Sequence, residues 1–183
     1  MKQYRTTAWA IASAVVAGAL AFSGAAKAAD FTDSEHVSKL LSEAKMQAYQ
    51  LREDAAIMET FTRSNVSAES HATAITQIKE HVNALGRQLT KLKEARDLAA
   101  PWQKTAIDRI EPFLNELEGY TNAVIEQVNA NPTKLNTPEY RDYLEANADY
   151  ASDLAAMIAD FVNYGNTKHK FERLNKKLEV SKT

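Results

Sequence analysis

The 183-residue sequence contains no cysteine and few helix-breaking residues, with only five glycines and four prolines. Without cysteine there is no disulfide, no thiolate metal ligand, no cysteine nucleophile and no C-x-x-C-H haem attachment. The scarcity of glycine and proline leaves little of the turn chemistry that a many-stranded β fold requires. A hydrophobic content of 45% and a charged content of 25% are those of a globular protein. The composition therefore predicts one domain built from long helices.

The N-terminus has the three parts of a secretory signal peptide. Lys2 and Arg5 precede an apolar stretch over residues 8–22, and small residues lead to an Ala-Lys-Ala cleavage site at residues 26–28. This order predicts a signal peptide over residues 1–28 that is removed on export to the periplasm or the cell exterior. The apolar stretch is short for a membrane span, which needs about 20 residues. We therefore expect no membrane span after cleavage, with an uncleaved anchor as the alternative.

Charge is unevenly distributed along the mature chain that this cleavage would leave. Residues 29–183 carry 19 basic and 24 acidic residues, a net charge of −5. Residues 166–183 carry six basic and two acidic residues, so this tail has a net charge of +4 and the rest of the mature chain −9. A formal net charge of −2 for the whole chain gives no reason to expect nucleic-acid binding. The sequence predicts an acidic body with a basic tail.

Apolar residues recur every three or four positions along four segments of the mature chain, which is the pattern of amphipathic helices. Thr32 and Glu35 have the spacing of a capping box, which predicts the start of the first helix. The third helix is predicted to begin at or near Pro101. Its apolar stripe is Trp102, Ala106, Ile110, Phe113, Leu117, Tyr120, Val124 and Val128. Thr137 followed by Pro138 predicts the start of the fourth helix. Gly165 is predicted to end the fourth helix in a left-handed cap.

Four such helices joined by short breaks predict an all-α fold, an up-down-up-down four-helix bundle over residues 29–165. Pro112 is expected to kink the third helix, because proline removes a backbone hydrogen bond. Residues 166–183 are expected to form a basic tail or a short fifth helix. An alternative stays open, since the stripe of the second helix continues in phase across Pro101 into the third. The two helices would then form one bent helix in an elongated, dimeric rod.

His71 lies at a core position of the second helix, and a bundle would bring it near Met58, Glu126 and Tyr140. Histidine with methionine can ligate haem iron, and histidine with glutamate can hold a transition metal. A histidine near a bundle end can also be part of the fold, bonded to Glu126, Tyr140 or water. We favour this structural interpretation and expect no cofactor. A haem- or metal-binding bundle is the alternative.

Arg96 and Asn147 are two further polar residues at core positions. Arg96 would lie level with Asp108 and Asp160, so an ion pair is expected, with anion binding as the alternative. Asn147 is expected in a polar layer with Tyr120, Gln77 and Asp54 that holds the helices in register.

The fourth helix carries two regular series of side chains beside its core stripe. The acidic series is Asp142, Glu145, Asp149 and Asp153. The aromatic series is Tyr143, Tyr150 and Tyr164, with Met157 completing a seven-residue spacing. The acidic series is either a solvated face or one that a partner, divalent cations or the basic tail neutralises. The aromatic series either packs on a neighbouring helix or forms a ridge that grips a partner helix or polymer.

The basic tail also contains Phe171, Leu174 and Leu178, the composition of a small surface-binding helix. Anionic lipid, an acidic partner or the acidic body itself could attract it, and a solvated terminus is the plainer interpretation. The sequence has no G-x-S-x-G, no H-E-x-x-H and no glycine-rich phosphate loop. It therefore predicts an exported, non-enzymatic bundle that acts through protein or cell-envelope surface interactions. The partner is unidentified, and a homodimer is an open alternative.

Overall fold

The computed structural model describes residues 32–64 and 66–180, and no strand forms among them. The elements are α1 (Glu35–Glu59), η1 (Thr60–Arg63), α2 (Ala68–Glu94), η2 (Arg96–Leu98), α3 (Pro101–Ala130) and α4 (Pro138–Val180), where η denotes a 3-10 helix. The predicted signal peptide over residues 1–28 lies outside the described residues.

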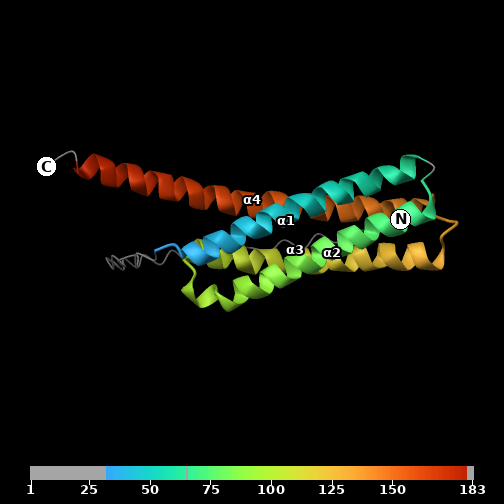
Figure 1. The fold of residues 1–183 in the computed structure, drawn as a ribbon, viewed down its shortest axis with the longest axis horizontal. Coiled ribbons are helices and arrows are strands. Elements are labelled where there is room, and N and C mark those ends of the chain that lie inside the picture. Colours follow the sequence, from blue (N-terminus) through green and yellow to red (C-terminus); the bar gives the residue numbers. More distant parts are fainter. Residues whose placement is uncertain (1–31, 65, 181–183) are drawn as a thin grey trace, which may run out of the picture. The chain divides into compact units, whose positions relative to one another are not determined.

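The four α-helices run alternately up and down (Figure 1). The packed pairs are α1 with α2, α2 with α3, α3 with α4 and α4 with α1. This closed ring of antiparallel pairs is the predicted up-down four-helix bundle, so the elongated rod was wrong. The second and third helices are not continuous, because η2 and the extended residues Ala99 and Ala100 separate them. Pro101 then opens α3, where its missing N–H leaves no hydrogen bond unmade.

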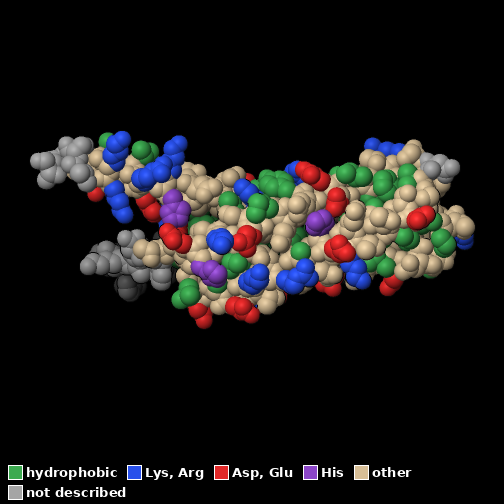
Figure 2. Space-filling view, viewed as in Figure 1, with side chains coloured by type: hydrophobic (Ala, Val, Ile, Leu, Met, Phe, Trp, Pro, Cys, Tyr) green, Lys and Arg blue, Asp and Glu red, His purple; other side chains and the backbone are tan. Residues whose placement is uncertain are grey.

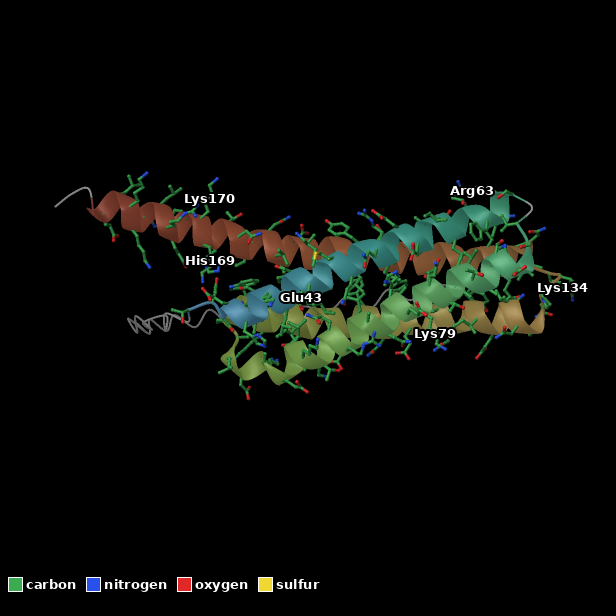
Figure 3. The ribbon with its side chains drawn as sticks, in the orientation of Figure 1. Glu43, Arg63, Lys79, Lys134, His169 and Lys170 are labelled. Carbon is green, nitrogen blue, oxygen red and sulfur yellow. The ribbon has the colours of Figure 1, made fainter. Side chains whose placement is uncertain are left out.

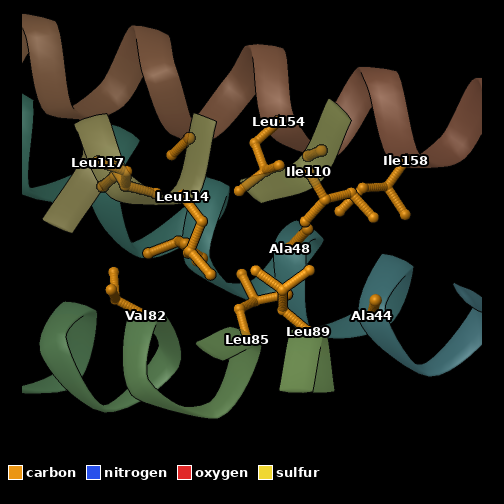
Figure 4. Packing of buried hydrophobic residues seen from close by; sticks show 14 of the residues in the cluster. Ala44, Ala48, Val82, Leu85, Leu89, Ile110, Leu114, Leu117, Leu154 and Ile158 are labelled. Atoms are coloured by element: carbon orange, nitrogen blue, oxygen red, sulfur yellow. The ribbon is translucent and has the colours of Figure 1, made fainter. Parts of the chain in front are cut away.

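The core is one cluster of side chains contributed by all four α-helices. Ala48 of α1, Leu85 of α2, Ile110 of α3 and Leu154 of α4 all point into this cluster between the helices (Figure 4). The apolar stripes predicted for α1 and α2 are the buried faces of these helices. Each large side chain buried in this way contributes about 1.5–3 kcal/mol, which makes the core the main source of stability.

The face that α3 buries is shifted from the one its sequence predicts. Ile107 and Leu114, which lie beside the predicted stripe, are fully buried. Three predicted positions are only half-buried, and all are aromatic: Trp102, Phe113 and Tyr120. Their rings contact tyrosines of α4, so they form the border between α3 and α4. The helix runs on through the exposed Pro112, and a bend there stays a prediction.

Hydroxyl side chains cap the starts of α1 and α4. The Thr137 hydroxyl accepts a hydrogen bond of 3.3 Å from the Tyr140 N–H, which confirms the predicted cap of α4. The first helix is capped by Ser34 and not by Thr32, which corrects the predicted capping box. The side chain of Gln103 from α3 bonds both the N–H and the C=O of Ser34. A tertiary contact therefore holds the residue at which α1 begins.

α4 is longer than predicted, because Gly165 lies inside it and does not end it. A Cβ atom built on Gly165 would lie 2.7 Å from Cη2 of Trp102. The glycine therefore gives space to the Trp102 ring, and its prediction as a left-handed cap was wrong. The basic C-terminal segment is helical, but it continues α4 to Val180 and is not a separate helix.

The last part of α4 runs beyond the starts of α1 and α3 (Figure 1). Residues 169–179 are all exposed. We call residues 169–180 the extension. None of the helices formed by residues 32–64 and 66–180 combines the length and hydrophobicity that a membrane crossing requires.

Candidate functional site

His71 is a core residue near the end of the bundle where α4 begins. Its Nδ1 atom lies 2.7 Å from the hydroxyl oxygen of Tyr140, and its ring packs in a T-shaped arrangement with Phe61, with the ring centroids 5.2 Å apart. Burial lowers the pKa of His71 and raises the pKa of Tyr140, so both side chains are held neutral. This is the geometry of a structural histidine whose polar atom has found a partner.

The other residues predicted for a haem or metal site occupy different environments. Met58 is fully buried in the core, whereas Glu126 is exposed on α3. Within the described part of the chain, no group of three or more His, Cys, Asp or Glu side chains is placed to hold a metal ion. Of the predicted set, the structure joins only His71 and Tyr140 by a hydrogen bond. A haem or metal site at His71 stays a prediction.

Arg96 pairs with Asp108 as expected, whereas Asn147 bonds none of its three expected partners. Arg96 lies in η2 beyond the end of α2, so it is outside the core, and its Nε and Nη2 atoms bond the Asp108 carboxylate at 2.9 and 2.8 Å. These bonds lower the pKa of Asp108. Asn147 is buried and donates a hydrogen bond of 2.9 Å to the hydroxyl of Thr121, the residue after the predicted Tyr120. The pair joins α3 and α4.

The acidic series of α4 is exposed along its whole length. Its members are Asp142, Glu145, Asp149 and Asp153. The predicted tyrosines differ from one another in exposure. Tyr143 and Tyr150 are half-buried, and the ring of Tyr150 packs against rings of α3. Tyr164 is 53% exposed and contacts the ring of Trp102, so of the three it is the one best placed to meet a partner.

A groove of about 720 Å³ opens between α3 and α4, and we call it the α3/α4 groove. Its lining residues are Trp102, Thr105, Arg109 and Phe113 from α3, and Asp153, Met157, Asp160, Phe161 and Tyr164 from α4. The groove therefore contains two of the predicted surface residues, Asp153 and Tyr164. Its other aromatic residues, Trp102, Phe113 and Phe161, were recognised in the sequence only as parts of helix stripes, because a groove depends on how two helices are spaced.

The α3/α4 groove combines apolar walls with exposed carboxylates. Asp153 and Asp160 are both exposed and lie seven residues apart on α4, which is about two helical turns. Met157 and Phe161 of the same helix are half-buried and belong to the apolar part of the lining. An apolar surface bordered by charges is the arrangement found in protein–protein interfaces. The groove can therefore accept an apolar surface that carries positive charge.

Asp33 connects the end of this groove to the base of the extension. Its carboxylate is 1% exposed, and its Oδ1 atom accepts hydrogen bonds from Nε1 of Trp102 at 2.7 Å and Nζ of Lys168 at 2.6 Å. Its Oδ2 atom lies 3.5 Å from Nε2 of His169. The hydrogen bond to Asp33 raises the pKa of Lys168. The cluster holds the Trp102 ring as a wall of the groove and anchors α4 where it leaves the bundle.

Sequence reasoning missed Asp33, which it placed inside a capping box. Its partners Trp102 and Lys168 lie 69 and 135 residues away along the chain, so no local pattern indicates the contact. Gln103 was missed for the same reason, because its side chain is buried through bonds to residues near the start of α1.

The extension presents both apolar and basic side chains to solvent. Phe171 is 62% exposed and Leu174 is 46% exposed. Basic side chains gather along this end of α4 (Figure 2), and His169 and Lys170 mark its beginning (Figure 3). On a helical projection of 100° per residue, Lys170 and Lys177 lie along one border of the apolar stripe.

The candidate site thus consists of two adjoining surfaces, the α3/α4 groove and the extension. The groove is apolar and carries two carboxylates and one guanidinium, that of Arg109, whereas the extension is apolar with an excess of basic over acidic side chains. The chain matches no family model, and no curated protein and no solved structure matches it.

Proposed function

We propose that the protein is an exported, non-enzymatic helical bundle that acts by docking a macromolecular partner on α4. The observation that carries the proposal is the exposure of Phe171 and Leu174 on a helix that has left the core. Burying a side chain of this size contributes about 1.5–3 kcal/mol, so a partner that covers the extension gains stability from it. Amphipathic helices with this pattern bind by laying their apolar face into a groove or onto a surface.

Export is supported by the order of charged, apolar and small residues over positions 1–28. A surface-binding role is also supported by the α3/α4 groove, which is lined by side chains typical of interface cores, including Trp102, Tyr164 and Met157. Met157 and Tyr164 lie on the same helix as the extension, so a single partner could contact both surfaces.

Site-specific photocrosslinking in cells that express the full chain tests this function. A benzophenone amino acid replaces Phe171, and a matched variant carries it in place of Asn122, which is exposed on α3. We expect irradiation to give a discrete adduct of higher mass from position 171 and not from position 122. Adducts of equal yield at both positions, or none at position 171, would contradict the proposal. Export is checked on the same protein by its N-terminal sequence, expected to begin at Ala29 or Asp30.

A further inference from the structure

The extension and the α3/α4 groove lie on one continuous face of α4. Side chains on this face recur every seven residues, which is close to two helical turns. The series is Tyr150, Met157, Tyr164, Phe171 and Leu178. Met157 and Tyr164 line the groove, whereas Phe171 belongs to the extension. One helix face therefore begins as the wall of a groove and continues as an exposed apolar ridge.

The charges along this face change sign where α4 leaves the bundle. Asp153 and Asp160 lie in the groove, seven residues apart, and Lys170 and Lys177 lie on the extension, also seven residues apart. Among the described residues, no ion pair involves any of these four side chains, whereas Lys168 is bonded to Asp33. The two pairs lie at nearly equal distances from Gly165, on opposite sides of it.

We propose that the partner docked on α4 is a second copy of this chain, with the extension of each copy lying in the α3/α4 groove of the other. This inference rests on the proposed function, because it names the partner. The two α4 helices run antiparallel about a two-fold axis near Gly165. Such an interface is isologous, so each contact occurs twice.

The antiparallel register buries apolar side chains of both copies and brings opposite charges together at the same time. With the axis between Gly165 and Asn166, Leu174 lies level with the partner's Met157. Lys170 then lies within one residue of the level of the partner's Asp160. Lys177 lies within one residue of the level of the partner's Asp153. The extension is covered and the groove is filled by the same contact. An anionic membrane would cover the extension and leave the acidic groove open, so the second copy explains more of the surface.

The size of the contact sets the concentration range in which the dimer forms. The face from residue 153 to residue 178 is about 39 Å long at 1.5 Å per residue. A single helix pair of this length, with Trp102 and Phe113 at its border, falls at the lower end of specific interfaces. We therefore expect dissociation in the micromolar range.

Sedimentation equilibrium of the purified mature chain over micromolar concentrations measures this association. We expect the wild-type protein to shift from the monomer to twice its mass, and the variant Lys170→Glu/Lys177→Glu to stay monomeric. The control Lys79→Glu/Lys91→Glu makes the same change in net charge on exposed residues of α2 and should dimerise as the wild type does. Circular dichroism shows whether each variant keeps its helical content.

Charge exchange between the two surfaces provides the decisive test. Asp153→Lys/Asp160→Lys should also stay monomeric, because it places positive charge in the groove opposite the basic extension. An equimolar mixture of this variant with Lys170→Glu/Lys177→Glu restores opposite charges at both contacts. We expect the mixture to form a heterodimer at concentrations where neither variant alone associates.

The outcomes separate this inference from the proposed function. Wild-type protein that stays monomeric, or a dimer that the charge variants leave unchanged, overturns the inference. A monomer whose position 171 still crosslinks to another macromolecule, or which co-sediments with phosphatidylglycerol vesicles, overturns the second copy as partner and leaves the docking role standing. A monomer with no adduct at position 171 contradicts both.

Discussion

At the scale of single residues, Gly165 and Trp102 determine how closely α3 and α4 approach each other. The indole ring of Trp102 occupies the space that a Cβ atom of residue 165 would need, and Asp33 holds the ring there through its N–H. The same ring forms a wall of the α3/α4 groove. The shape of the groove therefore depends on a residue that has no side chain.

We expect Gly165→Ala to lower the free energy of unfolding by about 1–3 kcal/mol, because the new methyl group overlaps the Trp102 ring. Gly119→Ala is the matched control, since a Cβ atom at Gly119 would meet nothing within 4 Å. This control should stabilise α3 by about 0.5–1 kcal/mol. Urea unfolding of both variants measures the difference. Equal effects of the two substitutions would show that Trp102 does not crowd Gly165.

His71 is expected to make stability depend on pH. Burial depresses its folded-state pKa below the ordinary value of 6.5, so the unfolded chain binds a proton first as the pH falls. The stabilising contribution of the neutral ring is complete above pH 6.5 and is lost as the pH falls through the depressed pKa. The loss from this one group is at most about 1.4 kcal/mol per pH unit.

Urea unfolding between pH 7.5 and pH 5 measures this contribution in the wild type and in His71→Gln. The variant keeps a polar group near Tyr140 and has nothing to titrate, so its stability should fall less over this range. His36, which is exposed on α1, provides the control substitution His36→Gln. Parallel pH profiles for the wild type and His71→Gln would contradict the prediction.

At the scale of elements, local signals account for where helices begin better than for where they end. Ser67 accepts a hydrogen bond of 3.2 Å from the Ser70 N–H and caps α2, and Thr137 caps α4. Each cap satisfies a backbone N–H that the helix itself cannot bond. The C-terminal end of α4 was not predictable in this way. Gly165 has the residue type of a cap, but its surroundings made it a packing position.

Ser67→Ala should lower the free energy of unfolding by about 0.5–2 kcal/mol, because the cap of α2 is lost. Ser152 is exposed in the middle of α4 and provides the control. Ser152→Ala should be neutral or slightly stabilising, since alanine has the higher helix propensity. Thermal unfolding followed by circular dichroism compares the two variants. A Ser67→Ala protein as stable as the wild type would mean that the cap contributes nothing.

At the scale of the whole molecule, closure of the bundle decides which faces remain free. Each α-helix packs against two neighbours, and the buried side chains form one cluster. The face of α4 beside α3 is only partly covered, and residues 169–179 of the extension are exposed. The surfaces available to a partner are therefore those that stay exposed because the four helices differ in length.

Much of the fold could be predicted from the sequence, whereas little of the candidate site could. Periodicity predicts the buried stripes of α1 and α2. The start of α3 at Pro101 and the up-down order were favoured by the sequence, but the structure was needed to exclude the continuous rod. Of the predicted surface residues, only Asp153 and Tyr164 line the groove. The other residues that line the groove could be identified only from the spacing between α3 and α4.

The sequence by itself determined the helical class and the separation of charge between body and tail. It could do so because helix periodicity, capping and net charge are properties of neighbouring residues. Tertiary structure alone decided the burial of Asp33, the continuation of α4 through Gly165 and the groove beside the extension. These features depend on contacts between residues far apart in the chain, such as Trp102 with Gly165 and Asp33 with Lys168. No local pattern contains such a contact.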